Sequence, residues 1–151
     1  MLLVNTVLSL LIVSSAESPC DSVCVSVLPV AGEYYYSLDI HMKYRGKDVI
    51  SVDESALPWS DSDRLSLKLA TKEGCTKTIV ETISISDAII GRVTLRPSKT
   101  LRGSLLLSKF PNLKEVAASC VVKGEWRYEL SDAQGRIIGT SSGMFDLGSR
   151  R

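Results

Sequence analysis

The stretch that decides the fold is VKGEWRYEL, residues 122–130, in which apolar or small residues alternate strictly with charged ones. One set of alternate positions holds Val122, Gly124, Trp126, Tyr128 and Leu130. A period of two is what an antiparallel strand with one buried and one solvated face requires. We therefore predict a strand here, with Trp126 and Tyr128 in the core and a hydrogen-bond partner for the polar tip of each ring.

The same alternation recurs along the chain, for example in LDIHMKY (38–44) and RLSLKLA (64–70), and SDAQG (131–135) provides a hairpin break. Strands are predicted at residues 22–29, 34–44, 64–71, 77–86, 91–96, 101–107, 121–130 and 136–147. No window carries a helical apolar stripe, and residues 112–120 allow a turn or two of helix at most. The pattern predicts an all-β fold, an antiparallel immunoglobulin-like two-sheet β-sandwich of seven to eight strands.

A second stretch, LRPSKTLRGSLLLSKFPNL (95–113), followed by KGEWRYEL (123–130), resembles secreted bacterial immunoglobulin-like domains, including some that accompany extracellular metallopeptidases. The matching positions are Leu95, Pro97, Leu101, Leu107, Ser108, Phe110, Gly124, Trp126 and Tyr128. The turn at 98–100 departs from the family's Gly-Glu-containing turn, and Leu106 stands where aspartate is common. The resemblance covers residues 91–147 at most. It implies the fold and brings no catalytic residue with it.

The residues of this stretch also have a physical interpretation of their own. Pro97 has no backbone donor, so it belongs at the end or the edge of a strand. Gly103, which shares its parity with inward-facing leucines, leaves space for a bulky neighbour. Phe110, beside Pro111, is expected to fold back over the open end of the sandwich.

Bulk composition indicates one globular domain and limits its partners. The chain has 151 residues, 44% of them hydrophobic, which suits a single domain with a substantial core. Its 18 basic and 17 acidic residues give a net charge of +1, which argues against a nucleic-acid or anionic-membrane surface. A local basic patch in three dimensions stays open.

The first residues predict export. LLVNTVLSLLIV (2–13) is an apolar run followed by small residues at Ser14 and Ala16, the pattern of a signal peptide spanning 1–16. The run is too short to span a bilayer, which takes about 20 apolar residues. We predict a secreted or periplasmic domain at 17–151 without stable membrane insertion after cleavage. Because no Lys or Arg precedes the run, a buried first strand is the alternative.

Four cysteines, Cys20, Cys24, Cys75 and Cys120, predict two disulfides in an exported chain. No CxxC pair exists and His41 is the only histidine, so a zinc site is disfavoured. Cys20 and Cys24 can join only if the chain turns between them, because residues four apart in a strand lie about 13 Å apart. Following the strands up and down favours Cys75–Cys120 with Cys20–Cys24, and leaves the crossed pairings open.

Catalytic and metal-binding motifs are missing from the sequence. His41 lies mid-strand on a polar face, and neither GxSxG, HExxH nor a phosphate-binding glycine loop occurs. The acidic loop 53–63 lacks the ligand order of a calcium loop, so a solvated loop is the simpler interpretation. We predict no cofactor, no metal and no enzymatic activity; a hydrolase with an unrecognised site is a third-ranked alternative.

The remaining hypothesis is an exported, non-catalytic binding or accessory domain that recognises a protein or glycan at the cell envelope or outside the cell. The alternative is a small inhibitor or immunity protein that blocks a hydrolase or toxin. Tyr34 and Tyr36 share the parity of an inward leucine, so the tyrosine between them faces outward. Because binding hot spots favour Trp, Tyr and Arg, often on loops, the candidate partner-binding residues are Tyr35, Trp59, Asp61, Asp63 and Arg64. Trp59 could instead cap the sandwich.

Overall fold

The computed structural model describes residues 20–61, 64–83 and 89–148. Within these ranges the chain forms eight antiparallel strands, one short helix and one 3-10 turn. In chain order the elements are β1 (Val23–Ala31), β2 (Tyr36–Tyr44), β3 (Ile50–Asp53), η1 (Glu54–Ala56), β4 (Leu65–Thr71), β5 (Arg92–Leu95), β6 (Thr100–Leu106), α1 (Leu113–Ser119), β7 (Val122–Ser131) and β8 (Ile137–Leu147). The predicted all-β class and the number of strands are confirmed.

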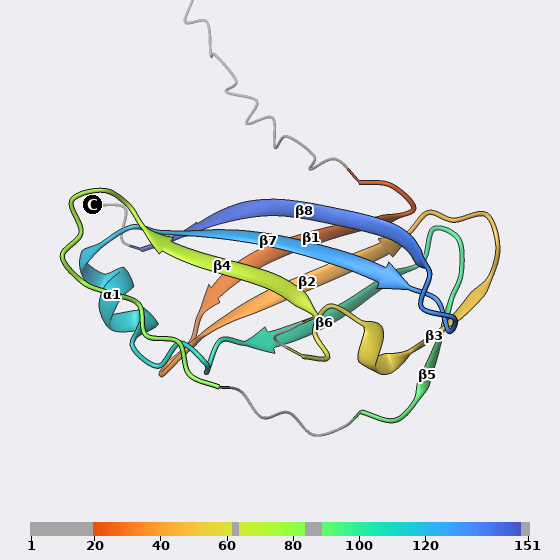
Figure 1. Ribbon diagram of the computed structural model, residues 1–151, viewed down its shortest axis with the longest axis horizontal. Helices are drawn as coiled ribbons and strands as arrows, with labels where there is room; N and C mark the ends of the chain where they lie inside the picture. The colour runs from red at the N-terminus through yellow and green to blue at the C-terminus, as the bar shows by residue number, and fades with distance from the viewer. Residues whose placement is uncertain (1–19, 62–63, 84–88, 149–151) are drawn as a thin grey trace, which may run out of the picture.

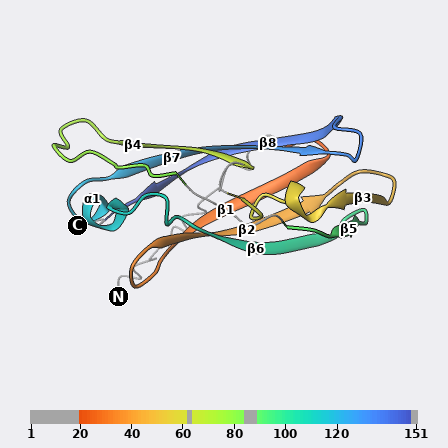
Figure 2. The same cartoon turned by 60° about the horizontal axis from the view of Figure 1, so that its bottom comes forward.

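The strands form two three-stranded sheets and one two-stranded ribbon (Figure 1). The β4–β7–β8 sheet lies over the β1–β2–β6 sheet as a second layer, and the β3–β5 ribbon extends from one end (Figure 2). Strands β1 and β8 run side by side and join the layers along one margin. There the Val25 amide donates to the Ser141 hydroxyl at 3.1 Å, and Cys20 forms a β-bridge with Ser141.

Some details differ from the sequence prediction. The short strand β3 was not predicted, since its four residues are too few to show a clear period. Residues 77–83 of the strand predicted at 77–86 are not a strand, and residues 84–88 lie outside the described ones. The segment is bonded to the loop before α1 instead: the Val80 amide donates to the Asn112 side chain at 2.9 Å and the Thr82 amide to the Lys109 carbonyl at 2.8 Å.

Strand β7 supplies the centre of the core, as its alternation predicted. Its burial alternates residue by residue from Val122 to Leu130, and both Trp126 and Tyr128 are buried. The Tyr128 hydroxyl donates to the Ala56 carbonyl at 2.7 Å, which provides the expected polar partner. Burial raises the pKa of this phenol above its usual value, so the group stays a neutral donor.

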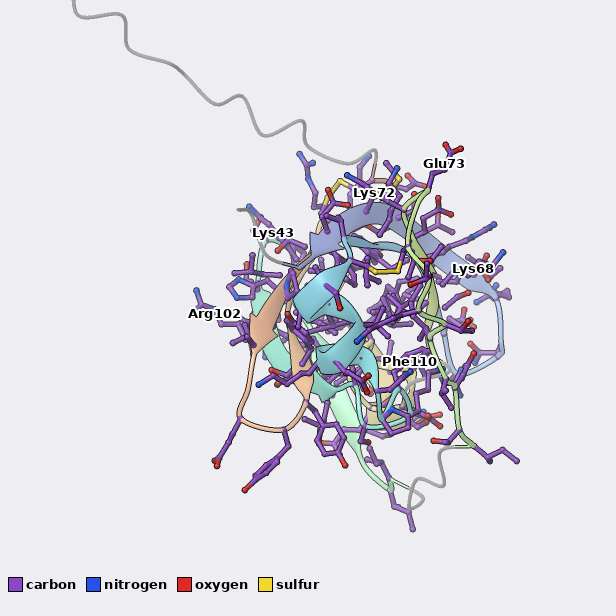
Figure 3. All side chains as sticks on the ribbon, turned by 90° about the vertical axis from the view of Figure 1, so that its left-hand side faces the viewer. Lys43, Lys68, Lys72, Glu73, Arg102 and Phe110 are labelled. Atoms are coloured by element: carbon purple, nitrogen blue, oxygen red, sulfur yellow. A yellow bond between two sulfur atoms is a disulfide. The ribbon has the colours of Figure 1, made fainter. Side chains whose placement is uncertain are left out.

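Helix α1 and Phe110 close one end of the space between the layers. Leu113, Val116 and Ala117 of α1 are buried together with Phe110, in agreement with the predicted role of that ring (Figure 3). Lys114 anchors the helix to the β1–β2 turn, because its ammonium group donates to two carbonyl oxygens of that turn. The turn or two of helix allowed by the sequence at 112–120 is therefore present.

Two disulfides connect these elements, and their pairing is the one that the strand directions favoured. Cys75–Cys120 joins the segment after β4 to the end of α1, and Cys20–Cys24 closes a local turn at the start of β1. Two disulfides indicate an oxidising compartment outside the cytoplasm. Within the described ranges, none of the helices is long and apolar enough to span a membrane.

Candidate functional site

The side chain of Trp59, one of the predicted partner-binding residues, packs into the protein. It lies between η1 and β4, is partly buried, and packs against the core. Its indole covers Gly103 of β6 so closely that a Cβ on that glycine would lie 2.1 Å from the ring. This confirms that Gly103 leaves space for a bulky neighbour. Residues 54–60 thus contact both layers, through Trp59 on β6 and the Ala56 carbonyl on β7.

Among the described partner-binding candidates, Tyr35 lies apart from Trp59. Tyr35 lies in the β1–β2 turn, where its carbonyl accepts from the Gly32 amide at 2.9 Å, and its side chain is exposed as expected. Trp59 covers Gly103, whose partner on β2 is Ile40. Tyr35 precedes Ile40 by five residues, which corresponds to roughly 16 Å of extended chain. The inward direction predicted for Tyr34 is wrong: it is 74% exposed, because β2 begins only at residue 36.

The acidic loop does not assemble a metal site among the described residues. Asp53 pairs with Arg92 at 3.6 Å, and the Asp61 carbonyl accepts from the Arg64 amide at 3.1 Å. Asp63 lies outside the described ranges. No group of three or more potential metal ligands occurs in residues 20–61, 64–83 and 89–148.

The two sheets present very different outward faces. On the β4–β7–β8 sheet, charges of opposite sign stand opposite one another, with Lys68 facing Glu125 and Lys123 facing Asp146. Arg127 of the same face forms an ion pair with Glu129 at 2.7 Å. Such an evenly charged surface is what a solvated face requires. Met144 of β8, 65% exposed, stands among these charges, opposite Glu125.

The outward face of the β1–β2–β6 sheet, hereafter the outer face, instead separates apolar from basic side chains. Its apolar end consists of Leu28, Val30 and Leu106, which are 63%, 43% and 55% exposed. Val30 and Leu106 occupy one row of the sheet, on either side of the small Ser37. Single exposed apolar residues are common on soluble proteins, but a group on one rigid sheet face marks a candidate binding surface.

The opposite end of the outer face is basic, and we define its basic end as Lys43, Arg45 and Arg102. Lys43 and Arg102 project from β2 and β6 on the same side of the molecule (Figure 3). The Arg45 guanidinium lies 3.7 Å from the Cys24 sulfur and 4.0 Å from the Cys20 sulfur, so the local disulfide supports it. Among the described residues, none of the three forms an ion pair with a carboxylate.

The middle of the outer face brings a serine, the histidine and an aspartate together. His41 Nε2 lies 3.3 Å from a carboxylate oxygen of Asp39, and Ser26 faces His41 across the strand pair. Nucleophilic catalysis needs a hydrogen bond between the nucleophile and its base. Within the described ranges no hydrogen bond joins His41 to a serine.

The sequence predicted only part of the outer face. Alternation placed Asp39, His41 and Lys43 on one polar face of a strand, but it could not show that Arg102 stands opposite His41. That pairing depends on the register between β2 and β6, which are separated by more than fifty residues. No protein-family model, no curated protein and no solved structure matches the chain.

Proposed function

We propose that the protein is an exported, non-catalytic binding domain, built as an immunoglobulin-like sandwich, which recognises a protein or glycan at the cell envelope or outside the cell. Its contact surface is the outer face of the β1–β2–β6 sheet. The observation that carries this proposal is the apolar end, because Leu28 and Leu106 remain more than half exposed on one face of a sheet. Burial of such side chains is the main favourable term in protein association.

The remaining features support the same proposal. The two disulfides fit a protein that works in an oxidising compartment, and residues 1–16 have the composition of a signal peptide. The alternative of an inhibitor that inserts a loop into a cleft is less well supported. The loop that the sequence suggested for this role contains Trp59. The indole of Trp59 packs against Gly103 and against the core, so this ring does not project freely into solvent.

Binding to the envelope fraction of the source organism tests the proposal. The mature, disulfide-bonded protein should bind saturably in a sedimentation assay. The double variant Leu28→Ser/Leu106→Ser should bind at least about tenfold more weakly, since each buried leucine contributes about 1.5–3 kcal/mol. The matched control is Ile137→Ser/Met144→Ser, which removes two similarly exposed apolar side chains from β8. Its affinity should stay within about twofold of wild type.

Unfolding in urea provides the necessary stability control. All four replaced side chains are exposed, so both double variants should unfold within about 0.5 kcal/mol of wild type. Equal binding by wild type, the double variant and its control would contradict the proposal. Binding that never saturates would do so as well.

A further inference from the structure

The basic end of the outer face gathers positive charge, although the net charge of the whole chain is only +1. Lys43 faces Thr100 and Arg102 faces His41, which makes the two cations diagonal neighbours, roughly 7–8 Å apart at the backbone. Figure 3 shows both on the β2 and β6 side of the molecule, away from Lys68.

The turn between β5 and β6 adds two more cations at the same end. Its backbone is joined to the end of β2, because Ser98 donates to the Tyr44 carbonyl at 2.8 Å and Tyr44 donates to the Lys99 carbonyl at 3.2 Å. Arg96 and Lys99 are both exposed in this turn.

The turn and the basic end together carry five cations with few carboxylates near them. They are Lys43, Arg45 and Arg102 of the basic end and Arg96 and Lys99 of the turn. None of the five takes part in an ion pair among the described residues. Asp48 is the carboxylate closest to Arg45 along the chain, and Asp21 adjoins Ser22, whose carbonyl accepts from the Arg45 amide. Asp39, four residues before Lys43, is already paired with His41. An array of unpaired cations on adjacent segments attracts a polyanion.

Hydroxyl groups accompany the cations on the same face. Ser26 lies on β1 opposite His41, while Thr100 and Ser104 lie on β6 on either side of Arg102. All three are exposed. Hydroxyls both donate and accept hydrogen bonds, which suits the hydroxyl groups of a sugar, whereas cations suit its sulfate or carboxylate groups.

We propose that the basic end binds an anionic polysaccharide, one that carries sulfate or carboxylate groups along its chain. This inference rests on the proposed function and names its ligand class. Charge complementarity selects a polyanion, and the disulfides place the protein where polysaccharides, rather than nucleic acids, are the abundant extended polyanions. An exposed sheet face with cations in neighbouring rows fits an extended chain lying across β2 and β6.

Binding to heparin, a sulfated polysaccharide, provides the test, with polygalacturonate as the carboxylated probe and dextran as the neutral one. The wild-type protein should bind at least one of the two anionic polymers at low salt, and its affinity should fall as the salt concentration rises. It should not bind dextran. The triple variant Lys43→Ser/Arg45→Ser/Arg102→Ser should bind on the order of 100-fold more weakly, given the contribution of each cation at an anionic surface. Lys43→Ser/Arg102→Ser, which keeps Arg45 beside the disulfide, should lose on the order of 20-fold.

The matched control is Lys68→Ser/Lys123→Ser/Arg127→Ser, which removes three cations from the outward face of the other sheet. It changes the net charge equally and should leave the affinity within about threefold of wild type. Equal losses in the two triple variants would overturn the inference, since binding would then follow net charge alone. Tighter binding to duplex DNA or to anionic lipid vesicles than to either polysaccharide would also overturn it.

The two proposals can fail separately. If the protein binds neither anionic polysaccharide but its envelope binding still depends on Leu28 and Leu106, only the proposed ligand class is wrong. If neither the apolar end nor the basic end affects any binding, the proposed function is wrong as well.

Discussion

Replacing Cys75 and Cys120 with serine should lower the free energy of unfolding by about 4 kcal/mol, the larger of two disulfide effects. The bond closes a loop with a sequence separation of 45 residues. In the chain-entropy account, the stabilisation grows with the logarithm of loop length because a longer loop restricts the unfolded chain more. The same bond also holds α1 over the end of the core, where Leu113 and Val116 are buried.

Cys20→Ser/Cys24→Ser is the matched control, because its sequence separation is only 4. The same relation gives about 2 kcal/mol for so short a loop. Urea unfolding of both double variants, followed by tryptophan fluorescence, measures the difference directly. A larger loss from the Cys20–Cys24 pair than from Cys75–Cys120 would contradict the assignment of Cys75–Cys120 as the main covalent support of the fold.

Replacing Trp59 with alanine should destabilise the protein by about 3 kcal/mol, at the lower end of the range for tryptophan because the ring is only partly buried. The physical reason is its packing on Gly103, because the absence of a side chain at this glycine leaves room for the ring on β6. Phenylalanine at this position should recover part of the loss, since it keeps an aromatic ring over the glycine.

A double-mutant cycle with Gly103→Ala isolates this contact. Alone, Gly103→Ala should be destabilising, because its Cβ would meet the indole at 2.1 Å and displace the ring. In the Trp59→Ala background the same change should cost little, since nothing remains to be displaced. If Trp59→Ala instead leaves stability unchanged and removes most envelope binding, Trp59 is a partner-binding residue, as the sequence had suggested.

Those features of the fold that depend on local pattern were predictable from the sequence. The alternation of 122–130 identified β7 and its buried Trp126 and Tyr128, because a period of two can bury only one side of a strand. Strand direction favoured the observed pairing of the disulfides, although it left the crossed pairings open. Gly103 could be read as space for a neighbour, although the sequence did not show that this neighbour is Trp59.

The features that were missed depend on contacts between distant segments. Residues 77–83 have strand-like composition, but three of their backbone groups bond to Lys109 and Asn112 instead of to a neighbouring strand. The direction of Tyr34 was wrong because the strand begins two residues later than predicted. The basic end could not be foreseen either, since only the register of β2 with β6 brings Lys43 and Arg102 together.

Lysine acetylation of the protein while it is bound to the envelope fraction tests most directly whether the outer face makes the contact. The free protein exposes Lys43 on the outer face and Lys68 and Lys123 on the opposite sheet, so all three should react with an amine-specific reagent. In the bound state, mass spectrometry should find Lys43 acetylated several times more slowly, with Lys68 and Lys123 unchanged. Protection of Lys68 and Lys123 with Lys43 still fully reactive would contradict the account, because the partner would then cover the β4–β7–β8 sheet.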